Sequence, residues 1–372
     1  MTLVFCSSFA LGAVFESPVS VYEIRPRAGA APDFPDEPLE LGAGDLAAEK
    51  EVGLAMLYGD GIPQDAAGAV RRLKPLAAAG DLELQILLGN LYAAGEGVSK
   101  DDREAFGWFL RAALKGSSEA QKRVAIAYRD GVGTKRSGED AVNWFLLSAW
   151  AGDLESAKIA GLALLRGEGV RRDPLAGLAW LKKAAGQGDA ESAMALAREY
   201  YAGDYVPKNY QASFDWYVRA AEAGDARAMR KVGEMLFSGL LDSPDKKGAL
   251  AWLEKAAVEG DLEAMLKLAK IFQDKDQEKA KRWLERAAAA GSAKASTRLG
   301  LMEAREGDPE EAFRRYKEAA EAGDPEAQYC LGMMHLSGDG APLDPFTAMD
   351  LIEKAAGQGN LSARETLMAL GF

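Results

Sequence analysis

A glycine followed by Asp, Ser or Asn recurs at a fixed interval along most of this chain. The interval is 36 residues six times in succession, and then 31, 32 and 36 residues. A period of 20–50 residues is typical of solenoids, in which each unit packs on its neighbours. Although the chain has 372 residues, we therefore expect one array and not two or three globular domains. The repeating glycines are Gly44, Gly80, Gly116, Gly152, Gly188, Gly224, Gly260, Gly291, Gly323 and Gly359.

Each unit is predicted to form two helices joined by a glycine-containing loop. In the second repeat, apolar residues follow helical spacing over about residues 82–94 and again over about 101–115. Gly95 and Gly97 lie between these stretches, where glycine reaches backbone angles that other residues avoid. The repeat is therefore a helix-turn-helix, and the array is all-α.

Six of the seven tryptophans occupy one position of the second helix. Tyr92, Tyr128, Tyr200 and the only histidine, His335, share one position of the first helix. Because both positions lie on apolar helix faces, these side chains are predicted to fill the core and not to stack on sugars or bases. The repeating tryptophans are Trp108, Trp144, Trp180, Trp216, Trp252 and Trp283.

The seventh and eighth repeats differ from the others because they have no glycine loop. Short turns replace it, within residues 274–279 and 305–311. We expect the array to bend or to change its pitch there. The last segment, residues 359–372, is predicted to form one final helix that caps the array.

The combined pattern is similar to a known repeat. It reads Leu88-Gly89-x-x-Tyr92-x-x-Gly95-x-Gly97-Val98, then Ala105-x-x-Trp108-x-x-x-Ala112-Ala113-x-x-Gly116. This pattern resembles the Sel-one-like repeat (SLR), a relative of the tetratricopeptide repeat (TPR). The resemblance covers residues 44–372 in about nine copies. It implies an α/α right-handed superhelical solenoid, with the first helix of each pair on the concave face, and a role as a scaffold or adaptor.

The residues before the array are predicted to form a separate region, residues 1–43. An apolar stretch, Leu3–Phe15, is followed by an arm that contains four prolines between residues 26 and 38. The apolar stretch has 13 residues, which is too short to span a bilayer. Its length suits the core of a signal peptide, but no basic residue precedes it. Export and a cytoplasmic location therefore both remain open.

Composition argues against several classes of function. The net charge is −12 and the pI is about 4.9, whereas proteins that bind nucleic acids usually carry a basic footprint. With one histidine and two cysteines, Cys6 and Cys330, that have no motif spacing, the chain predicts no metal site, no disulfide framework and no cofactor.

Two repeated features might suggest catalysis, but each has a structural explanation. The glycine loops follow helices, whereas a phosphate-binding loop follows a strand and contains a Gly-Lys-Ser/Thr triplet. Glutamates recur near the start of the first helices, where a negative charge favours the helix dipole. Glu119 is also expected to pair with Lys122 or Arg123, and Glu155 with Lys158, at a spacing of three or four residues. No catalytic residue is predicted, and a hydrolase remains only a distant alternative.

A candidate binding surface emerges where the units differ. In TPR-like geometry the groove is lined by positions 4, 7, 11 and 14 of each repeat, counted from its opening glycine. In the third to seventh repeats, several of these positions hold Lys or Arg and two hold aromatic residues. This pattern favours an acidic protein or peptide partner. We therefore predict a non-catalytic protein–protein interaction scaffold, with an exported component of cell-wall or exopolysaccharide assembly as the alternative. The predicted groove residues are Lys122, Arg129, Lys158, Arg198, Tyr201, Arg230, Phe237 and Lys270.

Overall fold

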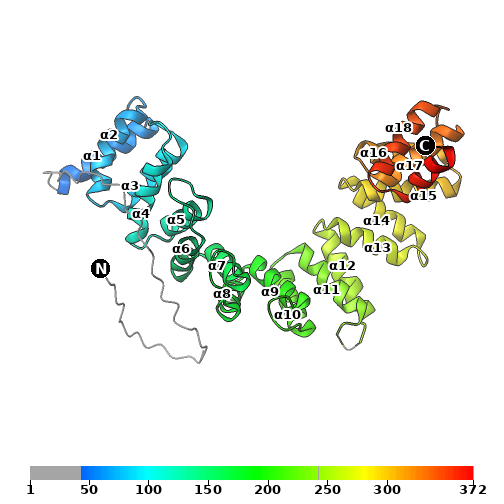
Figure 1. The fold of residues 1–372 in the computed structure, drawn as a ribbon, viewed down its shortest axis with the longest axis horizontal. Helices are drawn as coiled ribbons and strands as arrows, with labels where there is room; N and C mark the ends of the chain where they lie inside the picture. Colours follow the sequence, from blue (N-terminus) through cyan, green and yellow to red (C-terminus); the bar gives the residue numbers. More distant parts are fainter. Residues whose placement is uncertain (1–42, 242, 372) are drawn as a thin grey trace. The chain divides into compact units, whose positions relative to one another are not determined.

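The computed structural model describes residues 43–241 and 243–371. The apolar stretch and the proline-containing arm lie outside the described residues, so the expectations for them stay predictions. All the regular structure of the described residues is helical, in nineteen helices (Figure 1). The described residues form two compact units, which are divided between Lys208 and Asn209.

The helices alternate between the two members of a repeat. We call the first member, with an odd number, the A helix and the second member the B helix. In the first unit the A helices are α1 (Ala43–Tyr58), α3 (Leu82–Ala94), α5 (Ser118–Asp130), α7 (Leu154–Arg166) and α9 (Ala190–Ala202), and the B helices are α2 (Ala66–Ala78), α4 (Asp102–Leu114), α6 (Gly138–Trp150) and α8 (Pro174–Gly186). In the second unit the B helices are α10 (Tyr210–Glu222), α12 (Lys246–Val258), α14 (Gln277–Ala289), α16 (Pro309–Glu321) and α18 (Pro345–Gly357), and the A helices are α11 (Ala226–Ser238), α13 (Leu262–Phe272), α15 (Ala293–Glu306), α17 (Pro325–Ser337) and α19 (Leu361–Leu370).

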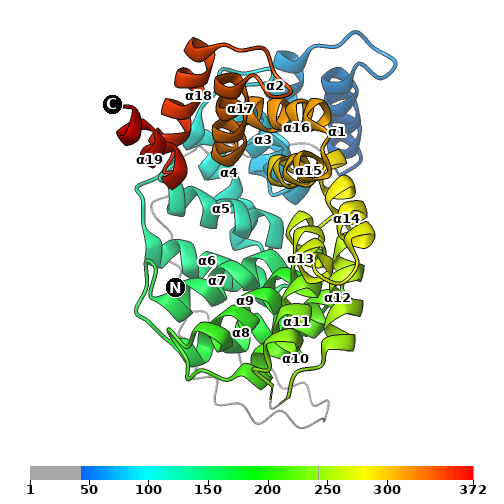
Figure 2. The same ribbon diagram turned by 90° about the vertical axis from the view of Figure 1, so that its right-hand side faces the viewer.

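Consecutive helices pack on one another within each unit. Helix α7 packs on α8 and α6 packs on α7 in the first unit, and α11 packs on α12 in the second. Figure 2 shows the same succession in a second view, with α5, α6 and α7 following one another in chain order. The predicted all-α solenoid of helix-turn-helix repeats is therefore confirmed.

Polar caps explain where the helices begin. A side chain of Asp, Ser or Asn accepts a backbone N–H at the start of each helix from α2 to α19, as Asp81 does from Leu84 at 3.0 Å. These bonds satisfy N–H groups that have no partner inside the helix. At the opening of the third repeat, Gly116 ends the preceding B helix with φ +92° and Ser117 caps the next A helix. The recurring Gly-Asp, Gly-Ser and Gly-Asn pairs thus stop one helix and start another.

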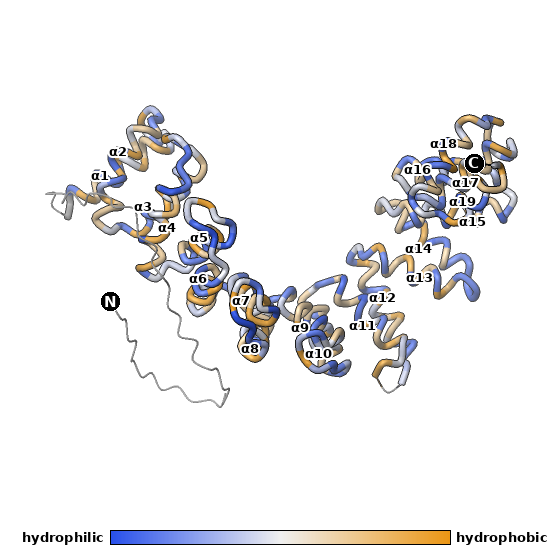
Figure 3. Tube along the Cα trace, viewed as in Figure 1, coloured by the Kyte–Doolittle hydropathy of each residue, from blue (hydrophilic) through white to orange (hydrophobic). Residues whose placement is uncertain are grey.

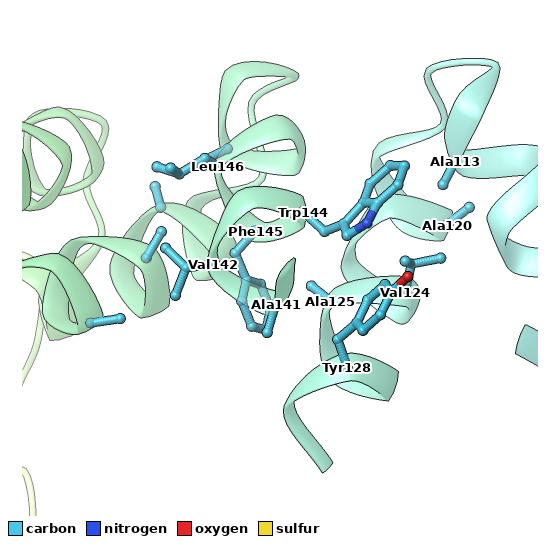
Figure 4. Close-up of a cluster of buried hydrophobic side chains, with 14 of the residues drawn as sticks. Ala113, Ala120, Val124, Ala125, Tyr128, Ala141, Val142, Trp144, Phe145 and Leu146 are labelled. Carbon is cyan, nitrogen blue, oxygen red and sulfur yellow. The ribbon is translucent and has the colours of Figure 1, made fainter. Parts of the chain in front are cut away.

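The core lies between successive helices. Trp108 and Trp144 are almost completely buried, and Tyr128 packs edge-to-face on Phe106 at 5.3 Å between ring centres. Figure 4 shows Tyr128, Val124 and Trp144 in one such cluster. Figure 3 shows apolar and polar residues mixed along the helices, as expected when one side of each helix is buried.

The later tryptophans depart from the core prediction. Trp180 is buried, with Trp150 packed edge-to-face on it at 5.1 Å, whereas Trp216, Trp252 and Trp283 are only half-buried. The position of Trp150 is occupied by Gly186 one repeat later and by Glu222 two repeats later. Neither residue can cover the next tryptophan ring as Trp150 covers Trp180. A cation three residues later lies over each half-buried ring, at 4.5–4.8 Å from the ring centre, as it also does over the buried rings of Trp108 and Trp180.

In four repeats the second glycine of the loop packs against the preceding repeat. A Cβ atom at Gly133 would overlap the carbonyl oxygen of Asp102, in the first turn of the preceding B helix. The loops at Gly97 and Gly340 meet Ala66 and Pro309 in the same way. The second glycine of the loop is therefore required by close packing between repeats as well as by its backbone angle.

This packing gives a prediction for Gly133→Ala. Gly133 and Gly61 have nearly equal φ angles, +70° and +72°, but a Cβ at Gly61 would meet no atom within 4 Å. Both alanine variants carry a left-handed cost of about 1–2 kcal/mol. Overlap should add about 1–3 kcal/mol at Gly133 alone. Thermal denaturation followed by circular dichroism should show the larger loss for Gly133→Ala, and equal losses would contradict the packing role.

Candidate functional site

The predicted groove residues lie on the A helices but differ in what surrounds them. Exposed residues at positions 4, 7, 11 and 14 of the repeats form what we call the A-helix face. In the first unit the predicted residues are Lys122, Arg129, Lys158, Arg198 and Tyr201, and in the second unit they are Arg230, Phe237 and Lys270.

The cations at position 7 join one repeat to the next. The Nζ of Lys50 bonds to Asp81 at 2.8 Å and to Glu83 at 2.7 Å, which are positions 2 and 4 of the following repeat. Lys122 bridges to Glu155 and Lys158 to Glu191 in the same manner. Within the second unit, the guanidinium of Arg230 lies 2.9 Å from Asp261.

These bridges correct the expected pairing within a helix. Lys122 and Lys158 contact the glutamate of the next repeat, and not the glutamate three residues earlier on their own helix. The reason is geometric, since the stacked A helices place position 7 beside the capped start of the following A helix. The signal is present in the sequence as a cation followed 31 and 33 residues later by Asp and Glu.

The bridges also shift the pKa values of the residues that form them. At Lys122, burial favours the neutral amine, but hydrogen bonds and the charges of Asp153 and Glu155 outweigh it and raise the pKa. At Asp153, burial favours the neutral acid, yet bonds from Ser156 and the charge of Lys122 lower the pKa. Lys122 and Asp153 therefore stay ionised over the physiological range, and each neutralises part of the other's charge.

The remaining predicted residues are more exposed. The guanidinium of Arg129 pairs with its neighbour Asp130 at 2.8 and 3.0 Å. Arg198 and Lys270, both at position 11, are exposed and make no hydrogen bond or ion pair with any described residue. Tyr201 and Phe237, both at position 14, are 42% and 41% exposed. Of the predicted groove residues, Arg198 and Lys270 therefore remain unpaired cations, and Tyr201 and Phe237 remain exposed aromatic anchors.

Groups able to carry chemistry are few in the described part of the chain. There, no three His, Cys, Asp or Glu side chains lie together as metal ligands. Glu303 on α15 is a buried acid whose pKa is raised by burial, but it is 5% exposed and a substrate has no access to it. The ring Nδ1–H of His335 donates a hydrogen bond to the carbonyl oxygen of Pro342 at 2.9 Å, and the ring packs edge-to-face on Phe313, as expected for a packing residue.

A model of the Sel1 repeat matches this chain nine times in succession. The matched segments are residues 46–81, 82–117, 118–153, 157–189, 190–225, 226–261, 262–292, 293–324 and 325–360. The chain belongs to the Sel1-repeat family. Each matched segment begins close to the capped start of an A helix, so the family repeat and the structural repeat coincide.

Two solved structures are similar to this Sel1-repeat protein over most of its length. A Sel1 repeat protein from Oxalobacter formigenes is 27% identical, over 88% of this chain and 87% of that chain, with a TM-score of 0.64. A protective antigen of uropathogenic Escherichia coli that displays an SLR fold is 32% identical, over 86% and 70% of the chains, with a TM-score of 0.60.

No functionally curated protein matches the chain. Sel1-repeat proteins typically serve as protein-interaction scaffolds. None of the described helices of this Sel1-repeat protein is both long and apolar enough to cross a membrane.

The position-7 bridges predict that Arg230 stabilises the Sel1 array. Its side chain is 18% exposed and bonds to Asp261 and to Glu234, so Arg230→Met should cost about 1–3 kcal/mol. Arg305→Met is the control, because Arg305 is exposed in the same unit and forms no ion pair with a described residue. Urea denaturation should show a loss for the first variant only, and equal midpoints would contradict the stabilising role.

The same bridge predicts a pH dependence. Burial alone would raise the pKa of Glu234, but bonds from Lys231 and Arg230 lower it below the ordinary value of 4.5. Because the folded pKa is depressed, this stabilisation is present above pH 4.5 and is lost as the pH falls through the lowered value. The stability difference between wild type and Arg230→Met should therefore be constant near neutral pH and narrow in acid.

Cys330 on α17 should react slowly with alkylating reagents while the protein is folded. Burial raises the pKa of its thiol from 9.0 to about 11. At about pH 8, roughly one thiol in a thousand would be ionised, against about one in ten when unfolded. Peptide mass mapping after iodoacetamide treatment, which separates Cys330 from Cys6, should show modification only with denaturant. Rapid modification of the folded protein would contradict this burial.

Proposed function

We propose that this Sel1-repeat protein is a non-catalytic scaffold that binds an acidic protein segment on its A-helix face. The observation that carries the proposal is the difference between positions 7 and 11. The position-7 cations are engaged in bridges between repeats, whereas Arg198 and Lys270 at position 11 are exposed and unpaired among the described residues.

The chemistry of these residues suits recognition of carboxylates. A guanidinium can hold a carboxylate through two parallel hydrogen bonds, and an ammonium attracts it as a point charge. Tyr201 lies three residues after Arg198 on α9 and is 42% exposed, so the two side chains share one face of the helix. An aromatic surface beside a cation provides an anchor for an apolar side chain of the partner.

The bridges refine which residues should be tested. Reversing the charge of Lys158 would break its contact with Glu191 and disturb the stacking of repeats. Arg198→Glu changes the free cation alone. Lys182→Glu is the matched control, because Lys182 is exposed on the B helix α8 and its reversal alters the net charge equally.

The test begins with the full-length protein immobilised to capture partners from the cells that produce it. Each captured protein is then purified, and its affinity is measured for wild type, Arg198→Glu and Lys182→Glu. Arg198→Glu should weaken binding about tenfold or more, since repulsion replaces attraction, and unchanged melting should show that the fold is kept. Equal affinities for the two variants would refute the proposal.

A further inference from the structure

An open cleft of about 570 Å³ lies in the second unit, among α13, α14, α15 and α17. Leu284, Leu301 and Met302 give it an apolar lining. Three cations, Lys270, Arg298 and Arg305, line it as well, and only Lys270 belongs to the predicted groove. The size is within the range of ligand-binding clefts.

The cleft coincides with the two repeats that lack the glycine loop. Four of the other loops cover the first turn of the preceding B helix, among them those in which Gly97 lies against Ala66 and Gly340 lies against Pro309. Helix α15 instead connects to α16 through Gly307 and Asp308 alone. No such loop therefore covers the first turn of α14, and Gln277 at its start lines the cleft.

The charges in the cleft are unbalanced in favour of cations. Lys270, Arg298 and Arg305 make no hydrogen bond or ion pair with any described residue. Among the carboxylates that line the cleft, Glu306 is held by Lys281 at 3.1 Å, which leaves Asp274 and Glu326. Three free cations against two free carboxylates make the cleft locally positive, in a protein whose net charge is −12.

We propose that this cleft binds an acidic peptide segment that places an apolar side chain on the lining and its carboxylates on Arg298, Arg305 and Lys270. The proposal rests on the proposed scaffold function and names the segment that the second unit would hold. Two arginines and a lysine satisfy carboxylates, and the amides of Gln273 and Gln277 offer donors and acceptors to a peptide backbone.

The same features favour a peptide over a nucleic acid. A nucleic acid needs cations spread along its backbone, and this cleft also presents Asp274 and Glu326, which repel phosphates. A peptide can place its carboxylates beside the cations and its main chain beside the carboxylates. Asp274 and Glu326 then fix the register of the peptide, because they repel any further acidic residues that the peptide would place beside them.

The experiment uses the full-length protein and a phage-displayed library of short random peptides as the probe. Wild type should enrich peptides that combine acidic residues with an apolar residue. The variant Arg298→Glu/Arg305→Glu should reduce that enrichment about tenfold or more. The control Arg282→Glu/Lys317→Glu, which reverses two exposed cations of the B helices α14 and α16 outside both the cleft and the A-helix face, should retain it.

A second variant tests the cleft by shape. Replacing Gly307–Asp308 with the longer loop of the last full repeat, residues 338–344, should cover the start of α14 and abolish enrichment without removing a cation of the cleft. Circular dichroism checks that each variant is folded. If the loop graft does not fold, the charge variants decide.

The outcomes separate this inference from the proposed function. Absence of acidic enrichment, or enrichment that persists in Arg298→Glu/Arg305→Glu, would overturn the peptide cleft. A captured partner that responds to Arg198→Glu would still support the scaffold in that case. Conversely, acidic peptides lost with the cleft variants would support the cleft even if Arg198→Glu left every captured partner unaffected.

Discussion

Every other feature of this protein depends on the close stacking of one helical repeat on the next. A single pair of helices cannot bury its apolar face alone, so each repeat completes the core of its neighbour. Two contacts recur across these joints. The loop glycine, as at Gly133, lies against the first turn of the preceding B helix, and the position-7 cation bridges to the capped start of the following A helix, as Lys122 does.

The bridges separate structural charge from charge that is free to bind. A cation that pairs between repeats contributes to stacking and offers little to a partner, because its hydrogen bonds are already made. A cation at position 11 lies one turn further along the same helix, beyond the capped start of the next repeat. The A-helix face is therefore less basic than its composition suggests, and among its predicted groove cations Arg198 and Lys270 are the unpaired ones.

The short connection between α15 and α16 adds a cleft to the array without weakening its helices. Shortening the connection between α15 and α16 keeps the helices and their caps. It uncovers the start of α14 and opens a cleft with unpaired cations. Repeat proteins can acquire a binding site in this way without disturbing the stacking, since the loop is peripheral to the buried core.

The sequence by itself determined the repeat, the helices and most of the core. Glycine and a capping residue mark the helix ends at Gly116 and Ser117, and the periodic spacing of Trp108 and Trp144 identifies buried positions, because these effects are local or repeat with the chain. Only the tertiary structure decided which cations are engaged. Lys158 and Arg198 have the same formal charge on successive A helices, and their difference arises from whether a carboxylate of the next repeat lies within reach. The cleft also depended on the fold, since Arg298 and Arg305 line it with Lys270 only after the helices have stacked.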